Sequence, residues 1–282
     1  MWLDLRVQRR LQAAGQAFVL DVALQCTQRQ VVLAGPSGAG KSLTLKAVAG
    51  LLRPGQGHVR LQGQAVFDTA TGVDVPPQHR RLGYVFQDYA LFPHLSVRQN
   101  VAFGLEKGWL NPRVGQRFDA VEQWLHAFRI DTVGDLLPSQ VSGGQRQRTA
   151  LARALVTQPQ ALLLDEPFSA LDHDLRQHLR QELEAVLDKT GIPLLLISHD
   201  PQDVAMFGQQ VVHMESGQVV HGKEVSVDPD SNVRMIQPAA QAYPLLPPCN
   251  LSVEASTPNV STCLPLSANA HAGFGEGYRD EQ

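Results

Sequence analysis

The octapeptide GPSGAGKS, residues 35–42, limits what this 282-residue chain can fold into more than any other feature. It directly follows an apolar run, VVLA, and it leads into a segment, 42–52, in which Leu43, Ala47 and Leu51 recur at helical spacing. A buried strand, a glycine-rich turn and a helix therefore succeed one another. This order is typical of a parallel α/β sheet, in which each strand is followed by a crossover helix.

The composition of this loop suits a phosphate chain, whose dense negative charge must be met by several backbone N–H groups at once. Glycine lets the backbone curl into such a nest without Cβ clashes, and the helix that starts near Lys41 adds its unpaired N–H groups. In the pattern G-x-x-x-x-G-K-[ST], Lys41 can reach the β- and γ-phosphates and Ser42 can ligate Mg²⁺. The alternative interpretation is a glycine-rich turn with an exposed lysine. The predicted nucleotide-binding residues here are Gly35, Pro36, Ser37, Gly38, Ala39, Gly40, Lys41 and Ser42.

A second apolar run, ALLLDEP at residues 161–167, ends in two carboxylates. Adjacent acids at the end of a buried strand are costly unless a cation or a reacting water uses them. Asp165 is therefore predicted to hold Mg²⁺, directly or through water, and Glu166 to polarise a water in line with the γ-phosphate. The alternative is a strand end that meets solvent.

Apolar runs and amphipathic segments alternate along the rest of the chain. The runs at 31–34, 82–86, 161–164 and 194–197 are typical of strands buried on both faces, and the segments 42–52, 116–128 and 175–187 have helical spacing. The sequence therefore predicts an α/β fold whose parallel sheet is wound on both sides. Within the first 30 residues, apolar and polar residues alternate as in a β-hairpin, so an antiparallel flap is expected beside the parallel core.

Two further regions have a character of their own. Residues 98–155 are predicted to be mostly helical, carry Trp109 and Trp124, and form a subdomain inserted between two core strands. Beyond about Val225, seven prolines fall between Pro229 and Pro265 without any sustained period, which is typical of loop or disorder. A small docking element is the alternative for this tail.

Composition excludes several classes of protein. The 24 Lys and Arg against 27 Asp and Glu give a net charge of −3, unlike the basic balance of nucleic-acid binders, so nucleic acid is not an expected partner. Cys26, Cys249 and Cys263 have no CxxC spacing, which favours ordinary reduced thiols over a disulfide framework or a zinc site. No stretch approaches the roughly 18 apolar residues of a membrane-spanning helix, and the alternating N-terminus is typical of a strand, not of a signal peptide. If the protein acts at a membrane, a partner must cross it.

The segment VSGGQRQRTALARAL, residues 141–155, places two glycines after a serine at a helix start and so predicts a second phosphate-facing helix terminus. A single bound nucleotide would not need two phosphate-facing helix termini from the same chain. Two nucleotides held between two copies of the chain would need both termini from each copy. Together with GPSGAGKS, LLLDEP and SALD, this run resembles the nucleotide-binding subunit of ATP-binding-cassette (ABC) transporters. The resemblance covers about residues 1–222 and includes six elements in the family's order.

This resemblance implies a role for each matching residue. Gln87, in YVFQD, corresponds to the glutamine that contacts Mg²⁺ and the attacking water and senses the membrane partner. The loop SALD, 169–172, couples the two sites across the dimer, and His199, in LLISHD, contacts the γ-phosphate. Without the family position, a lone histidine after an apolar strand is more often structural. The signature residues that cap the γ-phosphate bound by the opposite subunit are Ser142, Gly143, Gly144 and Gln145.

The resemblance also implies a whole assembly. The expected fold is α/β: a P-loop NTPase core over residues 1–225, with an N-terminal antiparallel β subdomain and an inserted helical ABC signature subdomain, followed by the tail 226–282. A homodimer binds ATP and Mg²⁺ on the cytoplasmic face of the inner membrane. It drives transmembrane permease subunits, and a periplasmic solute-binding protein takes part indirectly. The expected catalytic residues are Glu166, His199, Lys41 and Gln87, and the expected metal ligands are Ser42, Gln87 and Asp165.

The chain departs from the family pattern in three places. Val141 replaces the usual leucine of the signature, and Leu43 stands where the family often has threonine. The family usually stacks an aromatic residue of the N-terminal hairpin on adenine, but QRRLQAAGQAF offers no tyrosine, and Phe18 falls in the following predicted strand. How the adenine is held therefore stays open.

The sequence from Val75 to Leu105 is similar to that of the ATP-binding subunits of importers that use a periplasmic binding protein. It is most like the ATP-binding subunit of the molybdate importer. Sulfate, iron(III), polyamine and sugar importers are the alternatives. The tail lacks the alternating strands of an oxyanion-binding β domain, so direct regulation by bound substrate is not expected. An ABC ATPase of DNA repair or translation is less favoured, because the chain has one cassette and no basic stripe. The arginines of the signature helix, Arg146, Arg148 and Arg153, are interpreted as a solvated face or a subunit contact.

Overall fold

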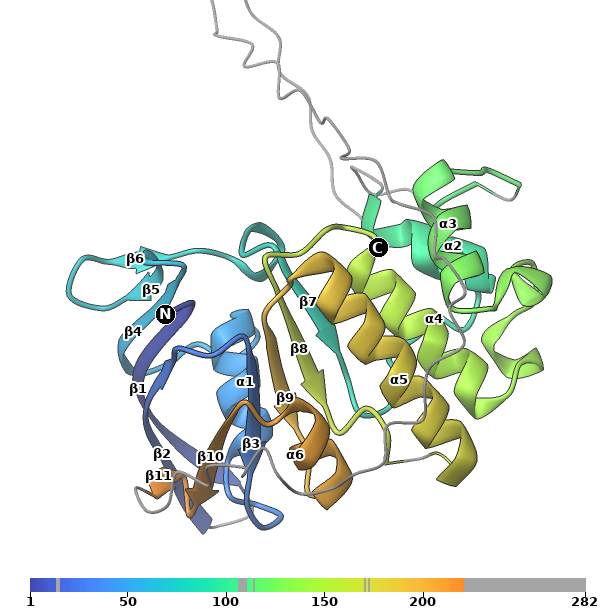
Figure 1. Cartoon of the computed structure of the whole chain (residues 1–282). Coiled ribbons are helices and arrows are strands. Elements are labelled where there is room, and N and C mark those ends of the chain that lie inside the picture. The colour runs from blue at the N-terminus through green and yellow to red at the C-terminus, as the bar shows by residue number, and fades with distance from the viewer. Residues whose placement is uncertain (14–15, 106–110, 114, 170, 172, 221–282) are drawn as a thin grey trace, which may run out of the picture. The chain divides into compact units, whose positions relative to one another are not determined.

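The computed structural model describes residues 1–13, 16–105, 111–113, 115–169, 171 and 173–220 (Figure 1). The expected tail at 226–282, Trp109 and two members of SALD, Ala170 and Asp172, lie outside the described residues. Within the described part, eleven strands form one sheet in the order β6-β5-β4-β1-β2-β11-β10-β3-β9-β8-β7. The predicted α/β class is confirmed.

One side of the sheet is parallel and carries the predicted apolar runs. It consists of β10 (Gln210–Glu215), β3 (Gln30–Ala34), β9 (Leu194–Ile197), β8 (Ala161–Asp165) and β7 (Leu82–Val85). Every residue of β3, β8 and β9 is buried. Because successive side chains of a strand point to opposite faces, both faces of this part of the sheet are covered.

The other side of the sheet is antiparallel and contains the expected N-terminal hairpin. Its strands are β6 (Val73–Asp74), β5 (Gln64–Asp68), β4 (Gln56–Leu61), β1 (Leu3–Ala13) and β2 (Gln16–Cys26). Strand β11 (Gln218–Val220) runs antiparallel to β10 and pairs in parallel with β2, which joins the two sides. The alternation predicted from the sequence is visible in the burial of Leu20, Val22 and Leu24.

Helix α1 (Lys41–Ala49) ends earlier than the predicted 42–52. Gly50 adopts a left-handed φ of +81° and its amide donates back to the carbonyls of Lys46 and Ala47, which closes the last turn. Leu51 therefore lies outside the helix and is 48% exposed. The prediction that Leu51 shares a helical face with Leu43 and Ala47 is wrong.

The segment between the neighbouring strands β7 and β8 is mainly helical in its described part. It contains α2 (Val97–Ala102), α3 (Asp119–Ala127) and α4 (Gly143–Leu155), with short 3₁₀ turns η2 (Phe103–Leu105), η3 (Asp131–Val133) and η4 (Pro138–Gln140). Helices α2 and α3 both pack on α4, and α4 packs on β7. The signature helix α4 thus joins the rest of the helical segment to the sheet.

The remaining helices are η1 (Pro77–His79), α5 (His173–Thr190) and α6 (Pro201–Phe207). Helix α5 extends the predicted 175–187 at both ends, whereas α3 is shorter than the predicted 116–128. Helix α6 contacts both α5 and β3. Over the described residues, no helix combines the length and the apolar character needed to cross a membrane.

Candidate nucleotide site

Four predicted segments leave the sheet side by side. Strands β3, β9, β8 and β7 are parallel neighbours, and their registers pair Leu33 with Ile197, Ile197 with Asp165, and Val85 with Leu164. The carboxyl ends of all four strands therefore lie at nearly the same level, which is where open α/β sheets bind ligands. The segments that follow them are the loop 35–42, His199, Asp165–Glu166 and Gln87.

The loop 35–42 connects β3 to α1 in a conformation that depends on glycine. Gly40 has a φ of +96°, and a Cβ there would lie 2.9 Å from Leu20 Cδ1. Among the described residues, no side chain caps the start of α1, so its first amides stay available to a ligand. Lys41 is 7% exposed, and its ammonium donates to the carbonyls of Gly35 and Pro36, each at 2.8 Å. Its charge is therefore held directly over the loop.

The structure brings Ser42 and Asp165, the two expected metal ligands of the loop and of β8, into contact. Ser42 Oγ donates to Asp165 Oδ1 at 3.0 Å, and the aspartate is 6% exposed. Burial raises the pKa of Asp165, the hydrogen bond from Ser42 lowers it, and the neighbouring charge of Glu166 raises it further. A hydroxyl and one carboxylate suit Mg²⁺, which uses few protein ligands together with waters and substrate phosphates.

Glu166 and His199 lie beside this pair. Glu166 has a left-handed φ of +46°, held by a hydrogen bond from its amide to the Ile197 carbonyl at 3.1 Å and by Ser169 Oγ donating to its carbonyl at 3.0 Å. Such backbone conformations persist where the surroundings enforce them, often at active sites. Glu166 Oε1 lies 3.6 Å from His199 Nδ1, with side chains 22% and 69% exposed. Both residues line a cavity of about 90 Å³.

Gln87 lies exposed in a turn after β7. Arg153 of α4 fixes this turn, because its guanidinium donates to the carbonyls of Tyr89 and Ala90, each at 2.7 Å. Both of these residues have left-handed φ values, +64° and +42°. The structure therefore places Gln87 near the edge that carries Asp165 without a hydrogen bond between them.

The other arginines of the signature helix also have partners within the chain. Arg146 donates to the Val141 carbonyl at 3.0 Å, and Arg148 lies 3.3 Å from a carboxylate oxygen of Glu182 on α5. Because Arg146, Arg148 and Arg153 are half-buried and have partners within the chain, their interpretation as a solvated face is wrong, and the alternative of a subunit contact stays a prediction.

Ser142 caps α4 in a capping box. Its Oγ accepts from the Gln145 amide at 3.3 Å, and Gln145 Oε1 accepts from the Ser142 amide at 2.8 Å. The two signature glycines differ: a Cβ on Gly144 would lie 2.3 Å from Leu175 Cδ2, whereas one on Gly143 would find its nearest atom 3.9 Å away. Packing inside the described chain therefore explains Gly144 and leaves Gly143 unexplained. Ser142 is exposed, and within the described residues no hydrogen bond joins it to the loop 35–42.

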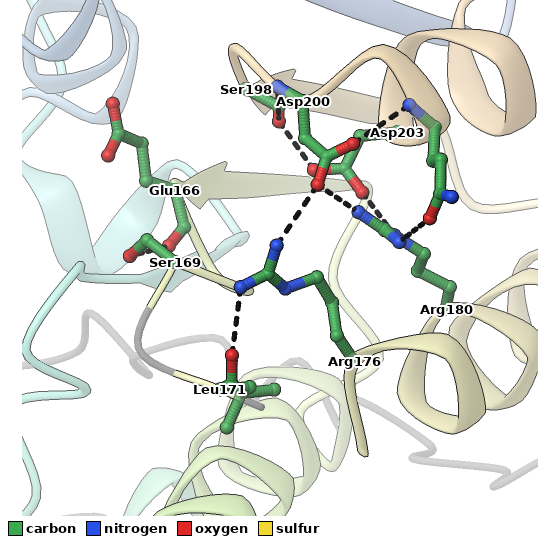
Figure 2. Close-up of polar contacts among 9 residues, drawn as sticks. Glu166, Ser169, Leu171, Arg176, Arg180, Ser198, Asp200 and Asp203 are labelled. Atoms are coloured by element: carbon green, nitrogen blue, oxygen red, sulfur yellow. Dashed lines mark hydrogen bonds and ion pairs between the residues drawn. The ribbon is translucent and has the colours of Figure 1, made fainter. Parts of the chain in front are cut away.

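Two features of the site were not predicted. A pocket of about 370 Å³ lies between residues 36–39 of the loop and residues 17–19 of β2, with Glu215 and Ser216. The Phe18 ring lies against the loop, with Cζ 3.3 Å from the position of a Cβ on Gly40. Strand alternation put Phe18 on the face of Leu20, but nothing local indicated that this face ends at the loop. The second feature is a polar network that holds the two chain neighbours of His199, Ser198 and Asp200 (Figure 2), and in which Ser198, Arg180 and Asp203 are buried.

Known proteins resemble this chain in sequence and in fold. A family model described as ABC transporter matches residues 20–169. A sulfate/thiosulfate import ATP-binding protein of Synechocystis sp. is 46% identical over 200 residues, which are 71% of this chain and 54% of that protein. A molybdenum import ATP-binding protein of Rhizobium johnstonii is 40% identical over 221 residues, 78% of this chain and 59% of that protein. The chain thus spans little more than half of these two relatives.

In two further comparisons, the match covers a larger share of the protein to which this chain is compared. A molybdate/tungstate import ATP-binding protein of Archaeoglobus fulgidus is 41% identical over 220 residues, 78% of this chain and 86% of that protein. The solved dimer of the ATP-binding cassette MJ0796, in a post-hydrolysis state bound to ADP and Pi, has a TM-score of 0.65 and 28% identity, covering 78% of this chain and 96% of that one.

Proposed function

Because this chain belongs to the ABC transporter family, we propose that it is the ATP-hydrolysing subunit of an importer and that it works as a homodimer. The single observation that carries this proposal is the convergence, at one sheet edge, of the Lys41 loop, the hydrogen-bonded pair Ser42–Asp165, and the pair Glu166–His199 at 3.6 Å. These groups are what phosphoryl transfer to water requires: a cation cradle, a metal site and a base beside the reacting water.

The chain's own residues divide the work of hydrolysis. Lys41 exchanges the carbonyls of Gly35 and Pro36 for the β- and γ-phosphate oxygens, and the first amides of α1 receive the same anion. Ser42 and Asp165 would hold Mg²⁺, with Gln87 as a further ligand, and the ion supplies charge neutralisation.

The base and its neighbour complete the reaction. Glu166 accepts the proton of the attacking water, because its carboxylate is half-buried and its backbone is fixed at three points. His199 orients that water and contacts the transferring phosphoryl group.

A second copy completes each site. Ser142 is exposed at the start of a capped helix, and Gly143 leaves its surroundings open for another molecule to approach. We assign the partner's γ-phosphate to this helix start, with Ser142, Gly143, Gly144 and Gln145 as its contacts. Loss of the γ-phosphate on hydrolysis then releases the dimer contact, and this opening drives the permease subunits.

The base of ATP is assigned to the pocket beside the loop. Its walls combine the Phe18 ring with the apolar surface of Ala17 and Val19, which suits a flat, largely apolar purine. Phe18 thus takes the part that an aromatic residue of the N-terminal hairpin usually has in the family.

The transported solute is assigned to the tetrahedral oxyanions, with molybdate as the first candidate. In support, the relatives reported above are named for import of sulfate and thiosulfate, molybdenum, and molybdate and tungstate. Sulfate is the main alternative, and iron(III), polyamine and sugar importers are weaker ones. The assigned partners are transmembrane permease subunits and, indirectly, a periplasmic solute-binding protein, which puts this subunit on the cytoplasmic face of the inner membrane.

Two measurements test these assignments separately. The purified chain should hydrolyse ATP only with Mg²⁺, and Lys41→Ala should abolish nucleotide binding; magnesium-independent turnover would refute the mechanism. In vesicles that contain the permease and its binding protein, molybdate should stimulate ATP hydrolysis. Stimulation by spermidine or iron(III) and not by molybdate or sulfate would refute the oxyanion assignment and leave the ATPase intact.

A further inference from the structure

The two neighbours of His199 are anchored by a buried network between α5 and α6 (Figure 2). Ser198 Oγ donates to one carboxylate oxygen of Asp203, and Arg180 Nε donates to the other. Arg180 Nη2 also donates to Asp200 Oδ2 at 2.7 Å. Since Ser198 and Asp200 flank His199 in the chain, this network fixes the backbone from which the exposed imidazole projects.

Asp200 is a branch point of this network. Its Oδ1 accepts from the Gln202 amide at 2.9 Å and so caps α6, while its Oδ2 faces two guanidinium groups. Burial opposes ionisation of Asp200, but the Gln202 amide and the Arg180 and Arg176 guanidinium groups hold its pKa below the ordinary value. This lowered pKa favours the ionised carboxylate, which pairs with both guanidinium groups.

Arg176 connects this network to a second segment. Its Nη1 donates to Asp200 Oδ2 at 3.2 Å, and its Nη2 donates to the Leu171 carbonyl at 2.8 Å. Figure 2 shows the guanidinium between these two partners. Leu171 belongs to SALD, which follows Glu166 by a single turn. The planar fork of one arginine thus spans the segment of the base and the segment of the histidine.

The cavity of about 90 Å³ gives this bridge a functional setting. Arg176 lines it together with Glu166, Ser169, His199 and Asp200. The Arg176 side chain is 28% exposed, so it borders the space where Glu166 and His199 face each other. A shift of Leu171 would change the position of Asp200 through this guanidinium.

We propose that Arg176 is a positioning residue for ATP hydrolysis, which fixes His199 relative to Glu166 by joining the Leu171 carbonyl to the Asp200 carboxylate. The inference rests on the proposed function, since it names a residue that supports the hydrolytic pair. The competing explanation is that Arg176 only holds α5 against the sheet. In that case its loss would lower stability and leave the histidine unaffected.

Kinetics of matched variants separate these explanations. Arg176→Gln should lower kcat about 10- to 100-fold and change KM for ATP less than about twofold, because misplacement of a catalytic group costs rate more than binding. Arg176→Lys should recover only part of the rate, since a point charge cannot serve both partners. Arg148→Gln is the control: it breaks an ion pair between α4 and α5, at 3.3 Å from Arg148 to Glu182, but involves neither Leu171 nor Asp200.

Combining Arg176→Gln with His199→Ala tests whether Arg176 acts through His199. In a His199→Ala chain, Arg176→Gln should reduce the residual single-turnover rate less than about twofold, because its route of action is already removed. An equal fold-reduction in both backgrounds would overturn the proposal, as would an equal loss of kcat in Arg148→Gln.

A readout without turnover keeps the inference separate from the ATPase proposal. With ¹³C-labelled histidine, the His199 resonance is identified by its loss in His199→Ala. It should shift in Arg176→Gln and stay in place in Arg148→Gln. If the His199 resonance does not move in a folded Arg176→Gln protein, the positioning role is refuted. If the resonance shifts in Arg176→Gln but the wild type does not hydrolyse ATP, only the proposed function is refuted.

Discussion

Replacement of Glu166 by glutamine isolates the proposed base from every other part of the site. Glutamine keeps the size of the side chain, and the backbone is held by the Ile197 carbonyl and by two hydrogen bonds from Ser169 to the Glu166 carbonyl, at 3.1, 3.3 and 3.0 Å. The left-handed conformation should therefore survive the change. What is lost is the ability to take a proton from water.

The size of the effect follows from that loss. A positioned general base contributes about 10²- to 10⁴-fold, so kcat should fall by that factor, which is about 3–5 kcal/mol of transition-state stabilisation. Binding should not weaken, because the negative charge of Glu166 repels the phosphates and raises the pKa of Asp165. The variant should bind ATP at least as tightly as the wild type and should accumulate as an ATP-bound dimer.

The assay pairs single-turnover hydrolysis with light scattering in Mg²⁺ and ATP. Glu184→Gln is the control, since it removes a half-buried carboxylate of α5 that lines neither the cavity at Glu166 nor the pocket beside the loop, and it should leave kcat within about twofold. Wild-type turnover in Glu166→Gln would remove Glu166 from its role. A monomeric, ATP-bound Glu166→Gln would contradict the coupling of nucleotide to dimer formation.

Three further predictions concern stability, the signature helix and the base pocket. Asp165→Asn should raise Tm at pH 7 and leave it unchanged near pH 3, because burial raises the folded pKa of Asp165 and so makes its ionisation costly as pH rises through the unfolded and then the folded value. A gain in Tm that grows toward acid pH would refute this prediction. Gly144→Ala should lower the free energy of unfolding by about 1–3 kcal/mol in chemical denaturation, since its Cβ would lie 2.3 Å from Leu175 Cδ2. Gly143→Ala should leave the free energy of unfolding unchanged and reduce the dimer-dependent ATPase. Equal stability losses in the two variants would contradict the distinction between the two glycines. Phe18→Ala should raise KM for ATP about tenfold and leave inhibition by tripolyphosphate, which has no base, unchanged; equal losses for both ligands would show that the ring supports only the loop.

The sequence predicted the parts of this fold that depend on local pattern. Strands β3, β8 and β9 were recognisable because each of their residues is either apolar or the first or last residue of the strand. Strands buried on both faces show such continuous apolar runs instead of an alternation of apolar and polar residues. The end of α1 was missed, since the Leu51 spacing continued the helical period past Gly50. A single left-handed glycine outweighed that apolar spacing.

The sequence named candidate site residues within its motifs and missed contacts to groups that belong to no motif. Ser42 and Asp165 were each named from a motif, and their roles stay predictions. The bridge by Arg176 joins a carbonyl and a carboxylate on separate loops, and a backbone acceptor leaves no trace in the sequence. The partners of Arg153 are likewise two carbonyls, so the sequence suggested only a solvated face or a subunit contact for this arginine.

Mixing two inactive variants tests most directly whether each active centre is shared between two copies. Lys41→Ala lacks the phosphate cradle, and Ser142→Arg blocks the start of the signature helix. In a mixed dimer, one of the two centres combines the intact Lys41 of one copy with the intact Ser142 of the other. Random pairing of equal amounts should restore about one quarter of the wild-type ATPase rate. A mixture as inactive as its two components, while mixed dimers are present, would contradict the shared centre.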